Sequence, residues 1–280
     1  MQARGVVHCK REPYDVYIGR PSKWGNPYEI GKDGDRAAVI ALHKSWLLTQ
    51  PDLLADLPEL DGKVLGCWCK HKLDIQCHGD TLADLVSKFG TAAWDGPVYV
   101  RGDATDPVGS GKKIICHVCN DIGAWGSGFV LALSRKWKAP EQEYRNWAHL
   151  REMVECKSGW IFGPPEEPCR KLHEANPFAL GSVQFVPVSD DITVANMVAQ
   201  HGVGKDEDGK PPIRYHAMKD CLATVAKRAL AEGASVHGPK FGADRAGGDW
   251  SVIAGTVQQE LSAKGVPVTV YLLPRKINGR

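Results

Sequence analysis

Three cysteines and a histidine lie close together between residues 67 and 78. Cys67 and Cys69 flank a tryptophan, and Cys77 is followed directly by His78. Three thiolates and one imidazole form a donor set that can hold a structural zinc ion in a tetrahedral site. The spacing departs from the common zinc motifs, because adjacent residues of an extended chain point in opposite directions. The alternative is that these cysteines are small hydrophobic residues of a core.

Two glycine-rich segments of the second half form another candidate site. Residues 120–129 and 238–249 each follow an expected strand and lead into an expected helix. Glycine allows backbone N–H groups to approach a phosphate, and the N-terminus of a helix favours negative charge. Taken singly, each segment could instead be a loop that only turns the chain. Two such loops after strands of one sheet could hold a diphosphate from both sides.

Three aspartates lie beside these features. Asp103 follows the expected strand 98–101 and could accept a hydrogen bond from an exocyclic amine, or cap a helix instead. Asp121 lies in the first loop and Asp244 in the second, and they are the only residues that we can name for activating a water molecule. Asp244 could alternatively pair with Arg245 or cap the turn before the next helix.

The elements around the cysteines predict a small α/β unit. The expected strands are residues 6–9, 14–18 and 63–68. A segment of turn-forming residues, 20–27, follows the second of them. Asp35 can cap a helix whose apolar residues recur at helical spacing, namely Val39, Leu42, Trp46 and Leu47. Asp80 is expected to cap the last helix, residues 80–89, which ends before Gly90.

The second half alternates between strands and amphipathic helices. The expected strands are residues 98–101, 113–118, 183–188, 194–199, 235–237 and 268–272. The expected helices are residues 129–136, 215–232 and 251–264. This alternation predicts a sheet with helices on both faces, in which ligands bind beyond the carboxyl ends of the strands. We therefore expect two domains, over residues 1–90 and 96–275.

The composition excludes several classes of protein. Of 280 residues, 43% are hydrophobic and 24% charged, which is the balance of a soluble globular chain and not of a disordered or coiled-coil one. The sequence has no apolar run long enough for a membrane span and no secretion signal, so no membrane partner is expected. A net charge of +2 argues against strong electrostatic binding of nucleic acid. Nine cysteines, an odd number, favour reduced thiols in a cytoplasm.

From about residue 98 to 273 the chain resembles the macrodomain family, an α/β/α fold with a mixed sheet that binds ADP-ribose. Residues 102–105, 120–121, 126–129, 194–197, 211–215 and 247–250 carry the resemblance in order. It implies that Asp103 holds the adenine amine, that Asn120 meets the distal ribose, and that the two glycine loops enclose the diphosphate. The implied ligand-binding residues are Asp103, Ala104, Asn120, Gly123, Trp125, Gly126, Ser127, Gly128, Phe129, Lys240, Phe241, Gly242, Ala243, Arg245 and Ala246.

The branch of the macrodomain family that the chain resembles includes ADP-ribose-1″-phosphate-processing proteins and terminal ADP-ribose protein glycohydrolases. It implies hydrolysis of an ADP-ribosyl linkage on protein or nucleic acid, or dephosphorylation of ADP-ribose-1″-phosphate, without a cofactor in the macrodomain. The chain departs from the pattern of this branch at two places that bear on the implied reaction. Phe129 and Val130 stand where many hydrolytic macrodomains carry an acid, and Asp244 replaces a small residue. The missing acid favours a module that binds ADP-ribose without chemistry. Residues 156–178 exceed the family pattern and receive no role.

Residues 6–88 resemble an uncharacterised bacterial and phage family, the domain of unknown function 4326, through residues 17–27, 66–69 and 77–80. This resemblance implies no activity, and it implies a location in the cytoplasm of a bacterium or of a phage-infected host. The turn-forming segment is either a rigid turn or a nucleotide-binding loop. Its candidate contacts are Arg20, Ser22, Lys23, Trp24 and Asn26. A third functional possibility is therefore catalysis in the N-terminal domain, with the macrodomain anchoring the substrate.

Overall fold

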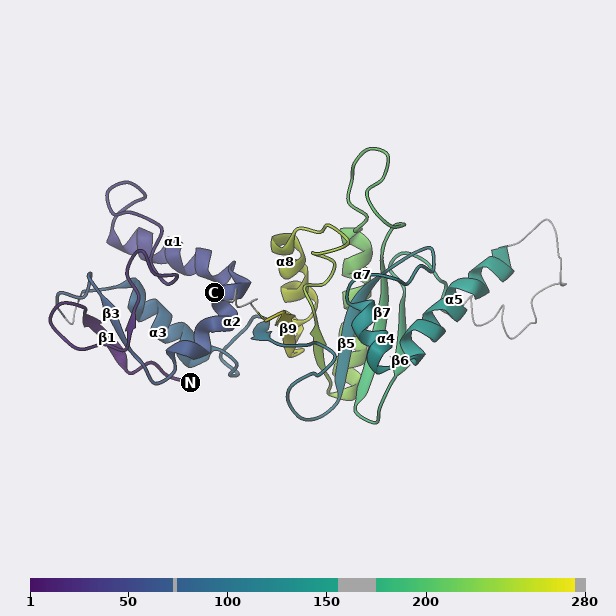
Figure 1. The fold of residues 1–280 in the computed structure, drawn as a ribbon, viewed down its shortest axis with the longest axis horizontal. Coiled ribbons are helices and arrows are strands. Elements are labelled where there is room, and N and C mark those ends of the chain that lie inside the picture. Colours follow the sequence, from purple (N-terminus) through teal and green to yellow (C-terminus); the bar gives the residue numbers. More distant parts are fainter. Residues whose placement is uncertain (73–74, 156–174, 275–280) are drawn as a thin grey trace, which may run out of the picture. The chain divides into compact units, whose positions relative to one another are not determined.

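The computed structural model describes residues 1–72, 75–155 and 175–274, which divide into two compact units, Met1–Val100 and Arg101–Arg280 (Figure 1). We call them the first and the second unit. Most of the 156–178 segment lies outside the described residues. Within the described ranges, every helix is too short or too polar to cross a bilayer.

The first unit is built on a three-stranded parallel sheet with the order β1-β3-β2. Its strands are β1 (Gly5–His8), β2 (Val16–Tyr17) and β3 (Val64–Cys67). Its helices are α1 (Arg36–Leu48), α2 (Pro51–Asp56), the 3-10 helix η1 (Leu57–Leu60) and α3 (His78–Lys88). As predicted, Asp35 caps α1 by accepting a hydrogen bond from the Ala38 N–H at 2.8 Å. Leu42 is exposed, however, and His43 takes its place on the buried face.

Helix α3 begins earlier than predicted, and the prediction that Asp80 caps it is wrong. Cys77 is the N-cap, and its sulfur accepts a hydrogen bond from the Gly79 N–H at 3.4 Å. Asp80 occupies the third helical position, where its carboxylate accepts a hydrogen bond from the Cys77 N–H at 2.9 Å. This is a reciprocal capping box with a cysteine in the place of the usual hydroxyl residue. The helix therefore starts at His78, beside the cysteine cluster.

The second unit is a three-layer α/β/α domain around a mixed six-stranded sheet with the order β4-β9-β8-β5-β7-β6. The strands of this sheet are β4 (Val98–Arg101), which spans the boundary between the units, β5 (Lys113–Asn120), β6 (Val183–Pro187), β7 (Ile192–Gln200), β8 (Ser235–Gly238) and β9 (Val268–Leu272). Strand β6 is antiparallel to β7, whereas β5 is parallel to both β7 and β8. The fold class expected from the sequence is confirmed.

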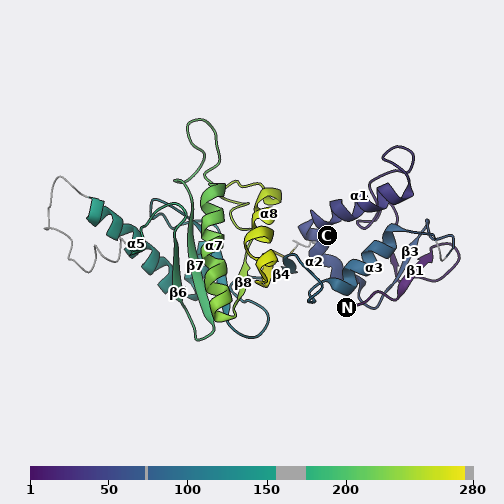
Figure 2. The same cartoon turned by 180° about the vertical axis from the view of Figure 1, so that it is seen from behind.

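Helices cover both faces of this sheet (Figure 2). They are α4 (Val130–Lys136) and α5 (Ala139–Glu155) on one face, and α7 (Tyr215–Glu232) and α8 (Trp250–Glu260) on the other, with the 3-10 helix η2 (Ser262–Lys264) after α8. The sequence did not predict α5. Its Tyr144 and Trp147 are buried against the sheet in one cluster with Trp125, Leu133 and Phe178.

Acid is expected to destabilise the second unit through two buried histidines, His117 and His237. Burial lowers the pKa of each to about 4, against about 6.5 in an unfolded chain. The unfolded chain therefore binds more protons between pH 6.5 and 4, so this part of the stability is complete above pH 6.5 and is lost as the pH falls to 4. The expected loss is on the order of 3 kcal/mol per histidine.

Denaturant unfolding measured from pH 7 to 4 tests this expectation. The Nε2 atom of His117 lies 2.6 Å from Asn196 Oδ1, so a glutamine at this position retains a donor without a titrating group. The His117→Gln variant should lose less stability than the parent over this pH range. Equal losses would show that His117 is not responsible.

Candidate functional site

The two glycine loops meet at the carboxyl edge of the sheet in the second unit. Residues 120–129 follow β5 and residues 238–249 follow β8, and these strands are parallel neighbours. Gly128 has a φ of +79°, and a Cβ atom there would lie 3.3 Å from the Arg245 side chain of the other loop. The loops are therefore in contact, as a shared ligand would require.

Asn120 shapes the first loop from inside. Its Oδ1 accepts hydrogen bonds from the N–H groups of Ile122 and Ala124, at 3.2 and 2.9 Å, and its amide donates to the Ala124 carbonyl. The Tyr144 hydroxyl, from α5, donates to the Asn120 carbonyl. The conformation of the loop thus depends on a helix that contributes no residue to it.

Several residues expected at the ligand are part of the core. Trp125 packs against Tyr144, and its indole N–H donates to Ser134 Oγ at 2.8 Å. The other buried residues of this set are Ala104, Asn120, Phe241 and Ala246. Their side chains support the loops, so a ligand in the loops could meet only their backbone.

The three aspartates have different surroundings. Asp103 accepts a hydrogen bond from the Thr105 N–H at 2.9 Å and so stabilises a turn, not a helix as the alternative proposed. Asp121 ties β5 to β7, because its carboxylate lies 2.7 Å from His201 Nδ1 and accepts a hydrogen bond from the Gly202 N–H at 2.8 Å. Both oxygens of the Asp121 carboxylate therefore already have partners within the protein.

Asp244 is exposed, and neither structural alternative holds for it. The cap of α8 is Asp249, which accepts a hydrogen bond from the Ser251 N–H at 2.7 Å. Among the described residues, Asp244 forms no ion pair with Arg245. Its carboxylate is thus available at the edge of the second loop.

In the first unit the cysteines and the histidine converge. Their ligand atoms, one from each of Cys67, Cys69, Cys77 and His78, all lie within 4.8 Å of one another. The Sγ atoms of Cys67 and Cys77 each lie 3.9 Å from His78 Nδ1. A zinc tetrahedron with ordinary bond lengths separates its ligand atoms by about 3.5–3.8 Å. The spacing of the cluster therefore fits one metal ion.

The expectation that Cys77 and His78 point in opposite directions is wrong, because they do not lie on a strand. Cys77 has extended backbone angles, but His78 opens α3, and this change of conformation turns both side chains to one side. His78 Nε2 lies 2.9 Å from the Ile18 carbonyl and donates to it, which leaves Nδ1 facing the thiols. Such a second hydrogen bond typically orients a metal-binding histidine.

The surroundings of the cluster shift the pKa values of its groups in different directions. Hydrogen bonds with Cys67 and Cys69, together with burial, raise the pKa of the Cys77 thiol. The N–H groups of Cys69 and Gly79 donate to the sulfurs of Cys67 and Cys77, each at 3.4 Å. Hydrogen bonds with Cys67, Cys77 and His78 lower the pKa of the Cys69 thiol. Burial lowers the pKa of His78, but its hydrogen bonds to Cys67 and Cys69 outweigh burial and raise it to about 10. Thiolates are the form that binds a metal.

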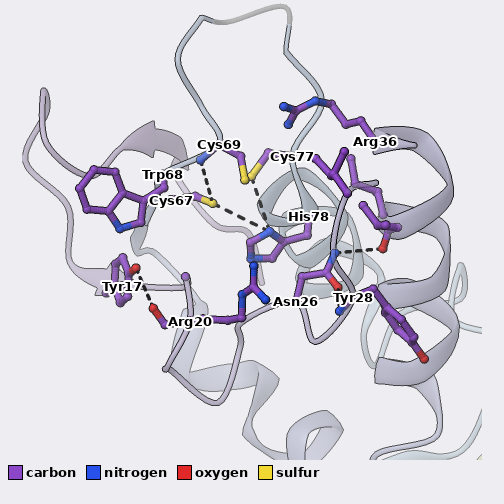
Figure 3. A pocket seen from close by; sticks show the side chains of 14 residues that line it. Tyr17, Arg20, Asn26, Tyr28, Arg36, Cys67, Trp68, Cys69, Cys77 and His78 are labelled. Atoms are coloured by element: carbon purple, nitrogen blue, oxygen red, sulfur yellow. Dashed lines mark hydrogen bonds between the residues drawn. The ribbon is translucent and has the colours of Figure 1, made fainter. Parts of the chain in front are cut away.

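A pocket of about 220 Å³ opens beside this cluster (Figure 3). The cluster lines it, together with aromatic and cationic side chains, namely Tyr17, Tyr28, Trp68, Arg20 and Arg36. In Figure 3 the Arg20 side chain extends toward His78, while Trp68 and Arg36 lie on opposite sides of the cysteines. The sequence carries one sign of this pocket, a tryptophan between two cysteines of the cluster.

The turn-forming segment contributes less than predicted. Arg20 and Asn26 line the pocket. Lys23 pairs instead with Asp56, 2.7 Å away, and Trp24 is buried. Ser22 Oγ is also buried. Lys23, Trp24 and Ser22 are therefore structural, and of the predicted contacts only Arg20 and Asn26 remain candidates.

Comparisons with known proteins find similar proteins for each unit. Residues 3–88 match the family model of a domain of unknown function, DUF4326. A macrodomain protein from Streptomyces coelicolor is 43% identical, with a TM-score of 0.48, over 62% of this chain and 97% of that chain. A protein of unknown function from Bacteroides thetaiotaomicron is 46% identical, with a TM-score of 0.52, over 62% of this chain and 95% of that one.

Curated relatives match over shorter parts of their length. An ADP-ribose 1″-phosphate phosphatase from Candida albicans is 36% identical over 53 residues, which are 18% of this chain and 34% of that protein. Chromodomain-helicase-DNA-binding protein 1-like from Mus musculus is 25% identical over 187 residues, or 63% of this chain. The chain spans only 18% of the length of this mouse relative.

Proposed function

Because the chain belongs to the macrodomain family through its second unit, at 43% identity to a macrodomain protein, we propose that this unit binds ADP-ribose between its two glycine loops. One observation carries the proposal. The loops follow neighbouring parallel strands and touch through Gly128 and Arg245. Backbone N–H groups of both loops can then surround a diphosphate, and the guanidinium of Arg245 adds a positive charge.

The reaction we propose is hydrolysis next to the distal ribose, on an ADP-ribosylated protein or nucleic acid or on ADP-ribose-1″-phosphate. Asp244 is the residue proposed to orient or deprotonate the attacking water, because it is exposed at the second loop. The relative from Candida albicans, named as an ADP-ribose 1″-phosphate phosphatase, supports the phosphatase form. Calorimetry with ADP-ribose, followed by hydrolysis assays on these three substrates, tests binding and reaction separately.

A second candidate function is binding without catalysis. The side chain of Asp121 is engaged by His201 and Gly202, and Phe129 stands at the place of the expected acid. The first loop thus offers no free carboxylate among its described residues. A protein that binds ADP-ribose but turns over none of the three substrates would favour this function.

Removing the carboxylate of Asp244 tests whether this residue takes part in the proposed hydrolysis. If Asp244 activates water, Asp244→Ala should lower the rate by about 10²–10⁴. The affinity for ADP-ribose should change little or increase, because a carboxylate repels the diphosphate. Asp121→Ala is the control in the other loop. If both variants keep full activity, neither carboxylate is the base, and catalysis lies in the first unit or in the phosphate of the substrate.

The adenine contact proposed for Asp103 is tested with a pair of variants. Asp103→Ala should lose a charge-assisted hydrogen bond and weaken ADP-ribose binding by roughly 1.5–3 kcal/mol. Since Asp103 also holds the Thr105 N–H, Asp103→Asn serves as a control that can keep this turn. Both variants should reduce the preference for ADP-ribose over its hypoxanthine analogue in calorimetry. An unchanged preference would contradict the adenine contact.

We also propose that Cys67, Cys69, Cys77 and His78 hold one structural zinc ion. Four protein donors complete a tetrahedron, so no coordination position is left for a substrate or a reactive water. The ion would fix the end of β3 against the start of α3. The second unit is proposed to need no cofactor.

A further inference from the structure

We propose that the pocket of the first unit binds a nucleoside 5′-monophosphate, with its phosphate at Arg20 and Arg36 and its base on Trp68 and Tyr17. This site is distinct from the proposed ADP-ribose site of the second unit. It rests on the proposed zinc site only for the rigidity of its wall. The charge, the ring surfaces and the size of the pocket each support the proposal.

Two cationic side chains line the pocket. Arg20 and Arg36 face it, and none of its described lining residues is acidic. The Arg20 guanidinium lies 3.0 Å from the Glu29 carboxylate, but both side chains are more than half exposed. Exposed ion pairs of this kind are weak, so a phosphate can compete for the guanidinium. Arg36 donates only to the neutral Gln76 carbonyl. A guanidinium group suits a phosphate, because it can donate paired hydrogen bonds to it.

Ring surfaces lie beside these charges. Trp68 is 49% exposed, although Cys67 before it is buried and Cys69 after it is half-buried. Tyr17 lines the same pocket. An exposed indole at the edge of a pocket offers a surface on which a nucleobase can stack. A planar ring attached to a phosphate matches this combination of side chains.

The size of the pocket selects a mononucleotide over a dinucleotide. Its volume of about 220 Å³ lies below the range of about 300–1,000 Å³ that is typical for drug-sized ligands. ADP-ribose, with two phosphates and two riboses, is too large to be enclosed. A base with one ribose and one phosphate can place its ring at the opening and its phosphate inside.

The cluster positions both halves of this site. Trp68 lies between Cys67 and Cys69, so a metal held by these thiols fixes the indole. His78 donates to the Ile18 carbonyl, two residues before Arg20, and so fixes the start of the arginine segment. Removal of the metal should therefore weaken mononucleotide binding as well as stability.

Calorimetry on the full-length, zinc-loaded chain carrying Gly128→Glu tests the site, because this substitution is designed to block the second unit. AMP and UMP should bind, whereas adenosine and ribose 5-phosphate should each bind at least about tenfold more weakly. Tryptophan fluorescence should change on AMP addition in the parent chain and stay unchanged in the Trp68→Leu variant. Arg36→Gln and Trp68→Leu should each weaken AMP binding by roughly 10- to 100-fold. Trp68→Phe should retain most of the affinity.

Lys44→Gln is the matched control, since it removes a positive charge from the same helix at an exposed position away from the pocket. It should leave AMP binding unchanged. Absence of AMP binding at millimolar concentration, or binding that survives both Arg36→Gln and Trp68→Leu, would overturn the proposal. The ADP-ribose proposal is tested separately. If it is correct, Gly128→Glu abolishes ADP-ribose binding and Trp68→Leu preserves it.

Discussion

Removing zinc with a chelator is expected to unfold the first unit and leave the second unit folded. Metal binding by structural zinc sites contributes about 10–16 kcal/mol in zinc-finger peptides, which is as large as the roughly 5–15 kcal/mol stability of most whole domains. The four ligands join β3 to α3, and without the ion three thiols and an imidazole remain crowded within 4.8 Å. Elemental analysis should find about one zinc per chain, and amide exchange should show protection lost only in residues 1–88.

Cysteine substitutions provide the matched comparison. Cys69→Ser should remove the metal and lower the melting temperature of the first unit. Cys9→Ser alters a free thiol outside the cluster and should do neither. A metal-free chain whose melting curve is the same with and without chelator would decide for the alternative, in which the cysteines are ordinary core residues.

Gly128→Glu is expected to abolish ADP-ribose binding. The Cβ atom would stand 3.3 Å from the Arg245 side chain, between the two loops, and the new carboxylate would face the diphosphate. Juxtaposed like charges cost several kcal/mol, so the affinity should fall by at least about a hundredfold. Calorimetry with ADP-ribose measures the change, and circular dichroism verifies the fold.

Two further glycine variants separate charge from backbone strain. Gly128→Ala introduces the side chain at a φ of +79° without the charge, so any loss it causes is due to strain. Gly204→Glu places the same carboxylate at a φ of +82° in open space and should leave binding unchanged. Intact ADP-ribose binding in a folded Gly128→Glu variant would contradict the phosphate-loop assignment.

Much of the fold could be predicted from local patterns, because strands β4 and β9 and helix α7 carry regular apolar spacing between clear turn residues. Helix α5 could not. Its first turn is polar, and its buried face depends on Tyr144 and Trp147, which pack against distant Phe178. The start of α3 was missed because Cys77 stands in the place of the usual capping residue. Asp80, the acid of the capping box, was therefore taken for the cap.

The metal donors could be predicted as a set from their residue types, but their convergence could not. It depends on the change from extended to helical backbone between Cys77 and His78 and on the hydrogen bond to Ile18, far away in the sequence. The pocket was harder still. Arg36 and Trp68 lie on different elements, and no spacing along the chain relates them.

The order of strands in the first unit has a consequence for how the chain is made. The central strand of its sheet, β3, is the last of the three in the sequence, and β1 pairs with it across 59 positions, from Gly5 to Val64. During synthesis β1 and β2 therefore emerge without a partner and must wait until β3 has left the ribosome. Closing so long a loop is slow. The proposed metal ligands lie at the end of β3 and beyond it, so they cannot speed the pairing of β1 and can only stabilise the sheet once it has formed.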